Sequence, residues 1–508
     1  MRKPIESLLP VLTGGAIPAS LLRERVRTAP ITALCYDSRL ATEGTVFFCL
    51  VGKVSDGHTF ALSAYRRGCR FFVAERELDI PDDAVIFTVP DTRAALADTA
   101  ALFYDHPERS IKLIGLTGTK GKTTTALLIQ NLLNGAGIPT GYIGTNGIDY
   151  ADYHYTTVNS TPESVEIYRH LRGMLDAGVD VCAMEISSQA LWMERTRGLV
   201  FDSTLFLNLS PDHIGGVEHP TMEHYRDSKK RLFTDYPTRT VVTGVDDPVT
   251  PYMTEGVTAP VLTFSTRDTA STWYAEGISP DRHGDRLGVS FTIKHNGKSI
   301  DGTWFLPLPG DFNVRNALAA LCVVCERFGV DPSKALELLS TVSVAGRFET
   351  VTSPALPDVT FIIDYAHNGV SLTSILDALA EYAPKRLICL FGSVGGRTKE
   401  RRRDLALAAA HRCDLCVLTA DNPADEPVMD IIREIDSHFP PDACPRIHEP
   451  DREVAIRDLV KNAEAGDVIL LAGKGHETYQ LIGARRVDFS EREILREALR
   501  ERALAGVM

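Results

Sequence analysis

The chain has 508 residues, of which 44% are hydrophobic and 24% charged, and its formal net charge is −13. This length predicts about three domains of ordinary globular composition. The acidic charge argues against a general nucleic-acid-binding protein, and no apolar run is long enough to insert into a membrane.

The N-terminal segment opens with basic residues, but its apolar stretch is short and contains Glu6. We therefore expect it to belong to the fold and not to a signal peptide.

Ten cysteines are scattered along the chain. The C-x-x-C pairs Cys322/Cys325 and Cys413/Cys416 are compatible with zinc, but their apolar surroundings favour buried thiols. This cysteine usage is typical of the reducing cytoplasm, where we expect a monomer.

Residues 1–108 are predicted to form a small α/β domain. Apolar runs alternate here with polar turns and an Ala-rich helical stretch, and the run that begins at Phe71 is predicted to be a strand. Asp37-Ser38-Arg39 follows the first run and by itself indicates only a turn with a surface ion pair. The polar segment around Pro107 is predicted to lead into the next domain.

The most informative stretch follows this segment. An apolar run from Ile111 leads into Gly118-Thr-Lys-Gly121-Lys122-Thr123, and helical apolar spacing comes next. This order predicts a strand, a glycine-rich loop and a helix, whose N–H groups converge on an anion. Lys122 is predicted to reach the outer phosphates of a nucleotide, and the Thr123 hydroxyl to bind Mg²⁺. The glycine spacing differs from the common phosphate loop, which argues against an ordinary kinase or GTPase.

Strands and helices alternate through residues 109–345, which predicts a mostly parallel sheet. Ser160-Thr161 precedes Pro162 at a helix start, where the hydroxyls could cap the helix or bind an anionic substrate. The apolar strand before Glu185 ends in a carboxylate at the edge where such sheets bind ligands, so Glu185 is predicted to hold Mg²⁺. Within residues 255–305, an alternating run followed by Asn296-Gly297 predicts a small antiparallel part.

Residues 346–508 are predicted to form a Rossmann-like doubly wound sheet. Four apolar runs in this segment each end in Gly or Asp. Polar clusters follow the runs that end at Gly392, Asp421 and Gly473. Because parallel strands share one carboxyl edge, we expect these clusters to lie together and form a site.

Together these motifs resemble those of the Mur ligases over nearly the whole chain. Within this family the chain is most similar to the enzymes that add the third amino acid to the peptidoglycan precursor UDP-MurNAc-L-Ala-D-Glu. The segments that carry the resemblance are Gly118-Thr-Lys-Gly-Lys-Thr-Thr-Thr, Gly310-Asp-Phe-Asn313, Gly346-Arg347-Phe-Glu349, Asp364-Tyr-Ala-His367, Asp421-Asn-Pro423 and Gly473-Lys-Gly-His-Glu477.

The resemblance implies a UDP-binding domain at residues 1–108, a central ATPase domain at 109–345 and an amino-acid-binding domain at 346–508. It also implies ATP and Mg²⁺ as cofactors. The residues implied to hold ATP are Gly118, Thr119, Lys120, Gly121, Lys122, Thr123, Thr124, Asn313, Arg347 and Asp364.

Further residues are assigned by the same resemblance. Mg²⁺ would be held by Thr123, Glu185, His213 and Lys229, the last as a carbamate (N6-carboxylysine), and the implied catalytic residues are Lys122, Glu185, His213 and Lys229. The uridine-linked substrate would contact Ser38, Ser160, Thr161, Ser187 and Arg195. The incoming amino acid would contact Arg397, Asp421, Asn422, Ala424, Asp425, Glu426, Gly473 and Glu477.

The residue at position 424 bears on which amino acid is added. Family members that add meso-diaminopimelate usually carry Arg there, and a guanidinium can bind the distal carboxylate bidentately. Ala424 cannot do so, and the acidic neighbours Asp425 and Glu426 suit a distal ammonium, unless they are simply a solvated loop. We therefore predict L-lysine, added to the D-Glu carboxylate through an acyl phosphate. The alternatives are the same reaction with meso-diaminopimelate or with another diamino acid such as ornithine.

Three other functions compete with this prediction. A folylpolyglutamate synthase would lack the N-terminal module that carries Ser38. A non-catalytic, nucleotide-binding regulatory protein would have no need of Lys122, Glu185, His213 and Lys229. A simple ATP phosphotransferase would release a stable phosphorylated product instead of an amide and phosphate.

Overall fold

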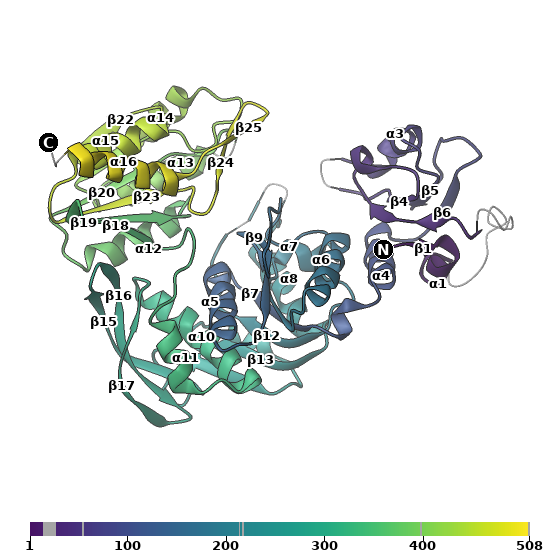
Figure 1. Cartoon of the computed structure of the whole chain (residues 1–508), viewed down its shortest axis with the longest axis horizontal. Coiled ribbons are helices and arrows are strands. Elements are labelled where there is room, and N and C mark those ends of the chain that lie inside the picture. The colour runs from purple at the N-terminus through teal and green to yellow at the C-terminus, as the bar shows by residue number, and fades with distance from the viewer. Residues whose placement is uncertain (14–26, 53–54, 213, 216–217, 397–398, 506–508) are drawn as a thin grey trace. The chain divides into compact units, whose positions relative to one another are not determined.

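The computed structural model describes residues 1–13, 27–52, 55–212, 214–215, 218–396 and 399–505. Figure 1 shows the whole chain. The chain divides into two compact units, one of Met1–Phe264 with Ala319–Val330 and the other of Ser265–Leu318 with Asp331–Met508. The division into three functional domains stays a prediction. No helix in the described ranges is long and apolar enough to cross a membrane.

The first unit opens with a four-stranded parallel sheet in the order β3-β4-β5-β6. Every residue of β4 and β5 is buried, as expected for parallel strands covered on both faces. The α/β organisation predicted for this segment is confirmed. Its strands are β1 (Lys3–Pro4), β2 (Pro30–Ile31), β3 (Ala33–Cys35), β4 (Thr45–Phe48), β5 (Phe71–Ala74) and β6 (Val85–Thr88), and its helices are α1 (Leu9–Thr13), α3 (Ala61–Arg66) and α4 (Thr92–Phe103).

The same unit holds a larger sheet in the order β10-β9-β8-β11-β7-β12-β13-β14. It is parallel from β8 to β14, with β9 and β10 antiparallel, which confirms the mostly parallel prediction. Its strands are β7 (Lys112–Thr117), β8 (Thr140–Gly144), β9 (Gly147–Tyr150), β10 (Tyr153–Tyr155), β11 (Val181–Glu185), β12 (Phe201–Phe206), β13 (Thr238–Gly244) and β14 (Val261–Ser265). The helices are α5 (Lys122–Gly135), α6 (Ser164–Asp176), α7 (Ser188–Trp192), α8 (Met222–Thr234) and α9 (Thr250–Thr254).

Strand β7 lies between β11 and β12, which follow it later in the chain. This arrangement puts the loop after β7 in the middle of the carboxyl edge of the sheet, beside the end of β11. Ligands bind at such edges in open α/β sheets. The fold therefore brings the glycine-rich loop and Glu185 to one place, although they are far apart in the sequence.

The second unit begins with three antiparallel strands, β15 (Trp273–His283), β16 (Arg286–His295) and β17 (Lys298–Leu306). Asn296 and Gly297 connect β16 to β17 with positive φ angles of 49° and 73°, the conformation of a tight hairpin turn. The predicted antiparallel part is thus confirmed. Helices α10 (Asp311–Phe328) and α11 (Pro332–Leu339) follow, and the part of α10 from Ala319 onward belongs to the first unit.

The last sheet has the order β18-β19-β23-β20-β21-β22 and is parallel except for β18. Side chains of α15 and α16 share one core with its strands, while α12 to α14 pack consecutively with one another (Figure 1). The predicted doubly wound sheet is confirmed. Its elements are β18 (Glu349–Ser353), β19 (Leu356–Asp364), α12 (Gly369–Ala380), β20 (Arg386–Phe391), α13 (Lys399–Ala409), β21 (Leu415–Leu418), α14 (Val428–Ser437), β22 (Arg446–His448), α15 (Arg452–Asn462), β23 (Asp467–Ala472), the hairpin β24 (Tyr479–Ile482) with β25 (Arg485–Asp488), and α16 (Glu491–Ala505).

Candidate functional site

The glycine-rich loop joins β7 to α5 as predicted. Gly121 precedes α5 with φ of +85°, a conformation that L side chains rarely adopt. The Lys122 ammonium donates hydrogen bonds to the carbonyl oxygens of Gly118 (2.8 Å) and Thr119 (3.1 Å). Thr123 is buried in the first turn of α5, where the backbone N–H groups of a helix lack partners within the helix. The Lys122 ammonium and the N–H groups at the start of α5 suit an anion, and the Thr123 hydroxyl beside them suits a cation.

Asn208, after β12, holds this loop in place. Its backbone carbonyl accepts from the Thr119 N–H (2.9 Å), and its side-chain amide exchanges hydrogen bonds with the backbone N–H (2.9 Å) and carbonyl (3.1 Å) of Lys120. The Lys120 ammonium forms an ion pair with Asp212 at 3.1 Å. This role of Asn208 was not predicted from the sequence, because a partner 88 residues away leaves no local signal.

Lys229 lies on the inward face of α8 and is only 1% exposed. Its ammonium donates to the Gly118 carbonyl (2.9 Å) and lies 4.4 Å from the ring centroid of Tyr225. Burial, reinforced by repulsion from Lys122, lowers the pKa of Lys229 well below its ordinary value. The neutral amine is the form that can react with carbon dioxide to give a carbamate. His213, predicted to lie near the same metal, is outside the described residues.

Glu185 ends β11 and is also 1% exposed. One of its oxygens accepts from the Tyr142 hydroxyl (2.5 Å) and the Thr145 N–H (2.9 Å), and the other accepts from the Thr145 hydroxyl (3.1 Å). The Thr145 hydroxyl also contacts that of Ser160 at 2.8 Å. Glu185 is thus a buried and oriented carboxylate, the kind of hard oxygen ligand that Mg²⁺ takes.

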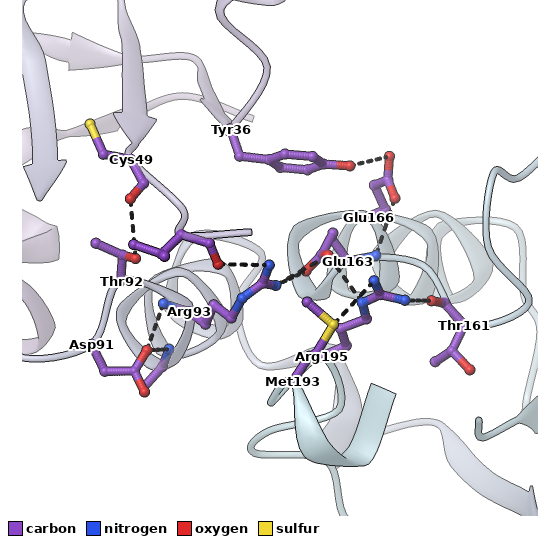
Figure 2. Close-up of polar contacts among 12 residues, drawn as sticks. Tyr36, Cys49, Asp91, Thr92, Arg93, Thr161, Glu163, Glu166, Met193 and Arg195 are labelled. Atoms are coloured by element: carbon purple, nitrogen blue, oxygen red, sulfur yellow. Dashed lines mark hydrogen bonds and ion pairs between the residues drawn. The ribbon is translucent and has the colours of Figure 1, made fainter. Parts of the chain in front are cut away.

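The predicted substrate residues Thr161, Ser187 and Arg195 form one network with Glu163. Thr161, Glu163 and Arg195 are buried and Ser187 is half-buried, and Figure 2 shows the three buried residues. The Thr161 hydroxyl donates to the Glu185 carbonyl (2.9 Å) and accepts from the Ser187 N–H (3.0 Å). Arg195 bonds the Glu163 carboxylate (3.0 Å) and the Thr161 carbonyl (3.2 Å). The structure therefore engages Arg195 in holding the Thr161 turn, a contact that the sequence analysis did not anticipate.

Glu163 connects this network to α4. Arg93 donates to both carboxylate oxygens of Glu163, at 3.0 and 3.2 Å, and Figure 2 shows Glu163 between the two guanidinium groups. Nearby, the Tyr36 hydroxyl donates to Glu166 at 3.4 Å. The contacts of Glu163 span 70 residues to Arg93 and 32 to Arg195, so only the fold reveals them.

We expect Glu163→Gln to lower the free energy of unfolding of the first unit by about 3 kcal/mol, because it leaves two mostly buried guanidinium groups without a carboxylate. Glu166→Gln is the matched control, since Glu166 accepts the long bond from Tyr36 and caps the Glu163 N–H at 3.3 Å. Calorimetric melting of both variants checks this. Equal melting temperatures for the two variants would contradict the bridging role.

Ser38 opens a short 3₁₀ helix, Ser38–Leu40, and is half-buried. The preceding Asp37 caps it by accepting from the Arg39 N–H at 2.9 Å, and Asp37 and Arg39 also form an ion pair at 2.6 Å. Its hydrogen bond to Arg39 lowers the pKa of Asp37. The turn with a surface ion pair is confirmed, and the contact of Ser38 with a uridine nucleotide stays a prediction.

In the second unit, Asp364 ties the end of β19 to the turn around Arg347. Its two oxygens accept from the N–H groups of Phe348 and Ala366, both at 2.8 Å. Burial raises the pKa of Asp364, with Arg347 acting in the opposite direction. Asn313, at the start of α10, is buried and donates to the Pro309 carbonyl at 2.7 Å. Arg347 and Asp364 therefore lie near each other, as two residues predicted to bind the same ATP molecule must.

The three polar clusters of the last sheet meet, as predicted from the carboxyl edge that parallel strands share. Gly395 N–H donates to the Asn422 carbonyl (3.0 Å), and the Asn422 side chain donates to Glu477 (3.0 Å). Lys474 is fully buried between them and donates to Glu477 (2.8 Å) and to Asn422 (3.1 Å). Gly473 lies against Asp421, since a Cβ on Gly473 would be 3.3 Å from the Asp421 carboxylate. Lys474 is the organising cation that the sequence analysis did not single out.

The acidic pair after Pro423 has two different environments. Glu426 bonds the Arg402 guanidinium at 2.6 and 2.8 Å and accepts from the Gly396 N–H at 3.1 Å. The bond to Arg402 lowers the pKa of Glu426 to about 2, so this carboxylate stays ionised and its negative charge is already compensated by the Arg402 guanidinium. Asp425 is exposed. The role given to Glu426 as a partner for a distal ammonium therefore loses its support, and Arg397 lies outside the described residues.

Comparisons with known proteins bear on both units. Residues 116–324 match the family model "Mur ligase middle domain", and residues 346–475 match "Mur ligase, glutamate ligase domain". A UDP-N-acetylmuramoyl-L-alanyl-D-glutamate–2,6-diaminopimelate ligase of Geobacillus thermodenitrificans is 38% identical over 480 residues, which cover 93% of this chain and 95% of that protein. One of the same name from Listeria monocytogenes is 35% identical over 507 residues and 97% of each chain.

Two solved structures have folds similar to that of this chain. A structure of a ligase with the same name has a TM-score of 0.66 at 25% identity and covers 97% of this chain and 98% of its own. A MurF ligase of Thermotoga maritima in complex with ADP has a TM-score of 0.60 at 18% identity and covers 96% and 100%. The second likeness concerns the fold.

Proposed function

The chain belongs to the Mur ligase family, and on this premise we propose that it joins a diamino acid to the D-Glu carboxylate of UDP-MurNAc-L-Ala-D-Glu. ATP and Mg²⁺ are the cofactors of this amide-forming family. The observation that carries the proposal is the buried amine of Lys229, held 2.9 Å from the Gly118 carbonyl of the glycine-rich loop. The cytoplasmic location and the monomeric state stay predictions.

The reaction needs an activated carboxylate, because an amine does not displace the oxygen of a free carboxylate at neutral pH. The D-Glu carboxylate attacks the terminal phosphorus of ATP, the bond between this phosphorus and ADP breaks, and the products are an acyl phosphate and ADP. The incoming amine then attacks the acyl carbon, and phosphate leaves from the tetrahedral intermediate. Two anions must approach each other in the first step, so positive charge has to lie at their meeting point.

The residues of the first unit suit this requirement. We assign Lys122 and the N–H groups at the start of α5 to the outer phosphates of ATP. Thr123 and Glu185, with Lys229 as its carbamate, offer the oxygen ligands that Mg²⁺ prefers. When bound, Mg²⁺ supplies the charge that screens the phosphate from the attacking carboxylate. Tyr142 and Thr145 hold the Glu185 carboxylate in one orientation.

For the incoming amino acid, we propose meso-diaminopimelate in place of L-lysine. The relatives described above are named 2,6-diaminopimelate ligases, which favours this alternative over our L-lysine prediction. The engagement of Glu426 by Arg402 also removes half of the acidic pair on which that prediction depended. Asp421, Asn422 and Glu477 suit the amine and carboxylate that both amino acids share.

The deciding measurement is phosphate release from ATP with UDP-MurNAc-L-Ala-D-Glu, comparing meso-diaminopimelate with L-lysine and identifying the product by mass. We expect release with meso-diaminopimelate and a product extended by that residue. Release with L-lysine alone would keep the ligase and reverse the specificity. A folded, ATP-binding protein that is silent with both and with ornithine would favour the non-catalytic regulatory alternative.

A further inference from the structure

We infer that Arg486, on the hairpin β24–β25, binds the distal carboxylate of the incoming diamino acid. The inference rests on the proposed function and names the group that recognises its substrate. A second carboxylate is what distinguishes meso-diaminopimelate from L-lysine. Position 424, where a guanidinium could reach it, is Ala. Arg486 is a cation on another described element beside the same loops.

The hairpin is built directly onto the loop that contains Ala424. The Ala424 N–H donates to the Leu481 carbonyl (3.0 Å), and the Gly483 N–H donates to the Ala424 carbonyl (2.7 Å). The Asn422 side chain accepts from the Leu481 N–H at 3.0 Å. On the other side of β24, Leu481 pairs with Arg486. One strand therefore separates Arg486 from the loop of Asp421 and Asn422.

The ring of Tyr479 connects Arg486 to the polar cluster. The Arg486 guanidinium lies 3.9 Å from the ring centroid, and the Lys474 ammonium lies 5.4 Å from it. Lys474 is in turn bonded to Glu477 and Asn422. Because both cations lie close to the same ring, the distance between the Arg486 guanidinium and the Lys474 ammonium cannot exceed the sum of their distances to its centroid. Stacking on an aromatic ring also holds a guanidinium in a defined plane without occupying its N–H donors.

Arg486 differs from two buried arginines of the same unit, Arg402 and Arg452. Arg402 is buried against Glu426 and Glu434, and Arg452 is buried against Glu491. Arg486 is exposed, and among the residues that the structure describes it has the ring contact but no ion pair. Its donors can therefore reach a carboxylate of the substrate in the bidentate geometry that arginine favours.

The size and charges of the ligand fit this position. Four carbon–carbon bonds of about 1.5 Å separate the two amino-bearing carbons of diaminopimelate, which gives a span of roughly 5 Å when extended. One end can therefore lie at Glu477 while the other lies beside Tyr479. The distal end carries an ammonium as well as a carboxylate, and the exposed carboxylate of Asp425, which lies beside Gly483 at the turn of the hairpin, suits that ammonium.

The test compares two amino acids in two variants of the full-length enzyme. We expect Arg486→Ala to raise the KM for meso-diaminopimelate about 10- to 100-fold, with kcat little changed and with the kinetics for L-lysine unaltered. Arg485→Ala is the matched control, because Arg485 pairs with Ile482 and so projects from the opposite face of the same hairpin. It should leave the KM for meso-diaminopimelate within about twofold of the wild-type value.

The possible results separate the role of Arg486 from the proposed function. A KM for meso-diaminopimelate that is unchanged in Arg486→Ala, or that rises equally in Arg485→Ala, overturns the inference and leaves the proposed ligase standing. A wild-type enzyme that uses L-lysine and rejects meso-diaminopimelate also overturns it. Wild-type protein that releases no phosphate with any diamino acid overturns the proposed function itself, and the inference with it.

Discussion

Replacing Lys229 by alanine is expected to reduce amide formation about a thousandfold or more. The side chain is 1% exposed and touches the Gly118 carbonyl, so its removal acts on the glycine-rich loop to which we assign the phosphates of ATP. As a carbamate, Lys229 would present an anionic ligand where the unmodified chain places a buried amine. Alanine offers neither form. Phosphate release under saturating substrates measures the loss.

Lys230→Ala provides the matched control for this prediction. Lys230 is the next residue of α8, but it pairs with Glu255 at 2.9 Å and stacks on Tyr252 away from the loop. We expect its activity to stay within about twofold of the wild type, as for most surface substitutions. In ¹³C-enriched bicarbonate, the wild type and Lys230→Ala should show a carbamate carbon signal that Lys229→Ala lacks. Full activity of Lys229→Ala would refute the carbamate and weaken the ligase assignment.

Much of the fold follows from local patterns that the sequence displays openly. The apolar runs that end at Glu185, Asp364 and Gly473 form strands that stop at or next to these residues. Asn296-Gly297 forms the hairpin turn that this pair favours. Ten free thiols, eight of them buried, match the expectation of small apolar side chains. In each case the signal that predicts the structure lies within a few neighbouring residues of the sequence.

What the sequence analysis missed depends on partners that are distant in the chain. Asn208 holds the glycine-rich loop, and Arg93 reaches Glu163, but no residue near either of them signals the contact. Arg402 compensates the charge of Glu426 across 24 residues, and this changes how an acidic pair should be interpreted. Charges that look available in a sequence are often already compensated in the fold, because buried charges require partners.

Glu185→Gln is expected to lower the rate of phosphate release about 100- to 1,000-fold and to raise the Mg²⁺ concentration needed for half-maximal activity. The carboxylate accepts three hydrogen bonds from Tyr142 and Thr145, which fix its orientation. An amide of the same shape carries no negative charge, and it would turn an N–H₂ group toward one of these donors. The substitution should weaken the binding of Mg²⁺ more than the binding of ATP. The affinity for ATP in the absence of Mg²⁺ should therefore change little.

Two further variants separate charge from orientation at this position. Tyr142→Phe keeps the Glu185 carboxylate but removes its 2.5 Å hydrogen bond. We expect the rate of phosphate release to fall about tenfold, as when a group that orients a metal ligand is removed. Glu223→Gln, on the exposed first turn of α8, removes one negative charge elsewhere and should be silent. If Glu185→Gln kept the wild-type dependence on Mg²⁺, the carboxylate would be a structural support of the Thr145 turn, and the cation would have to be held by other residues.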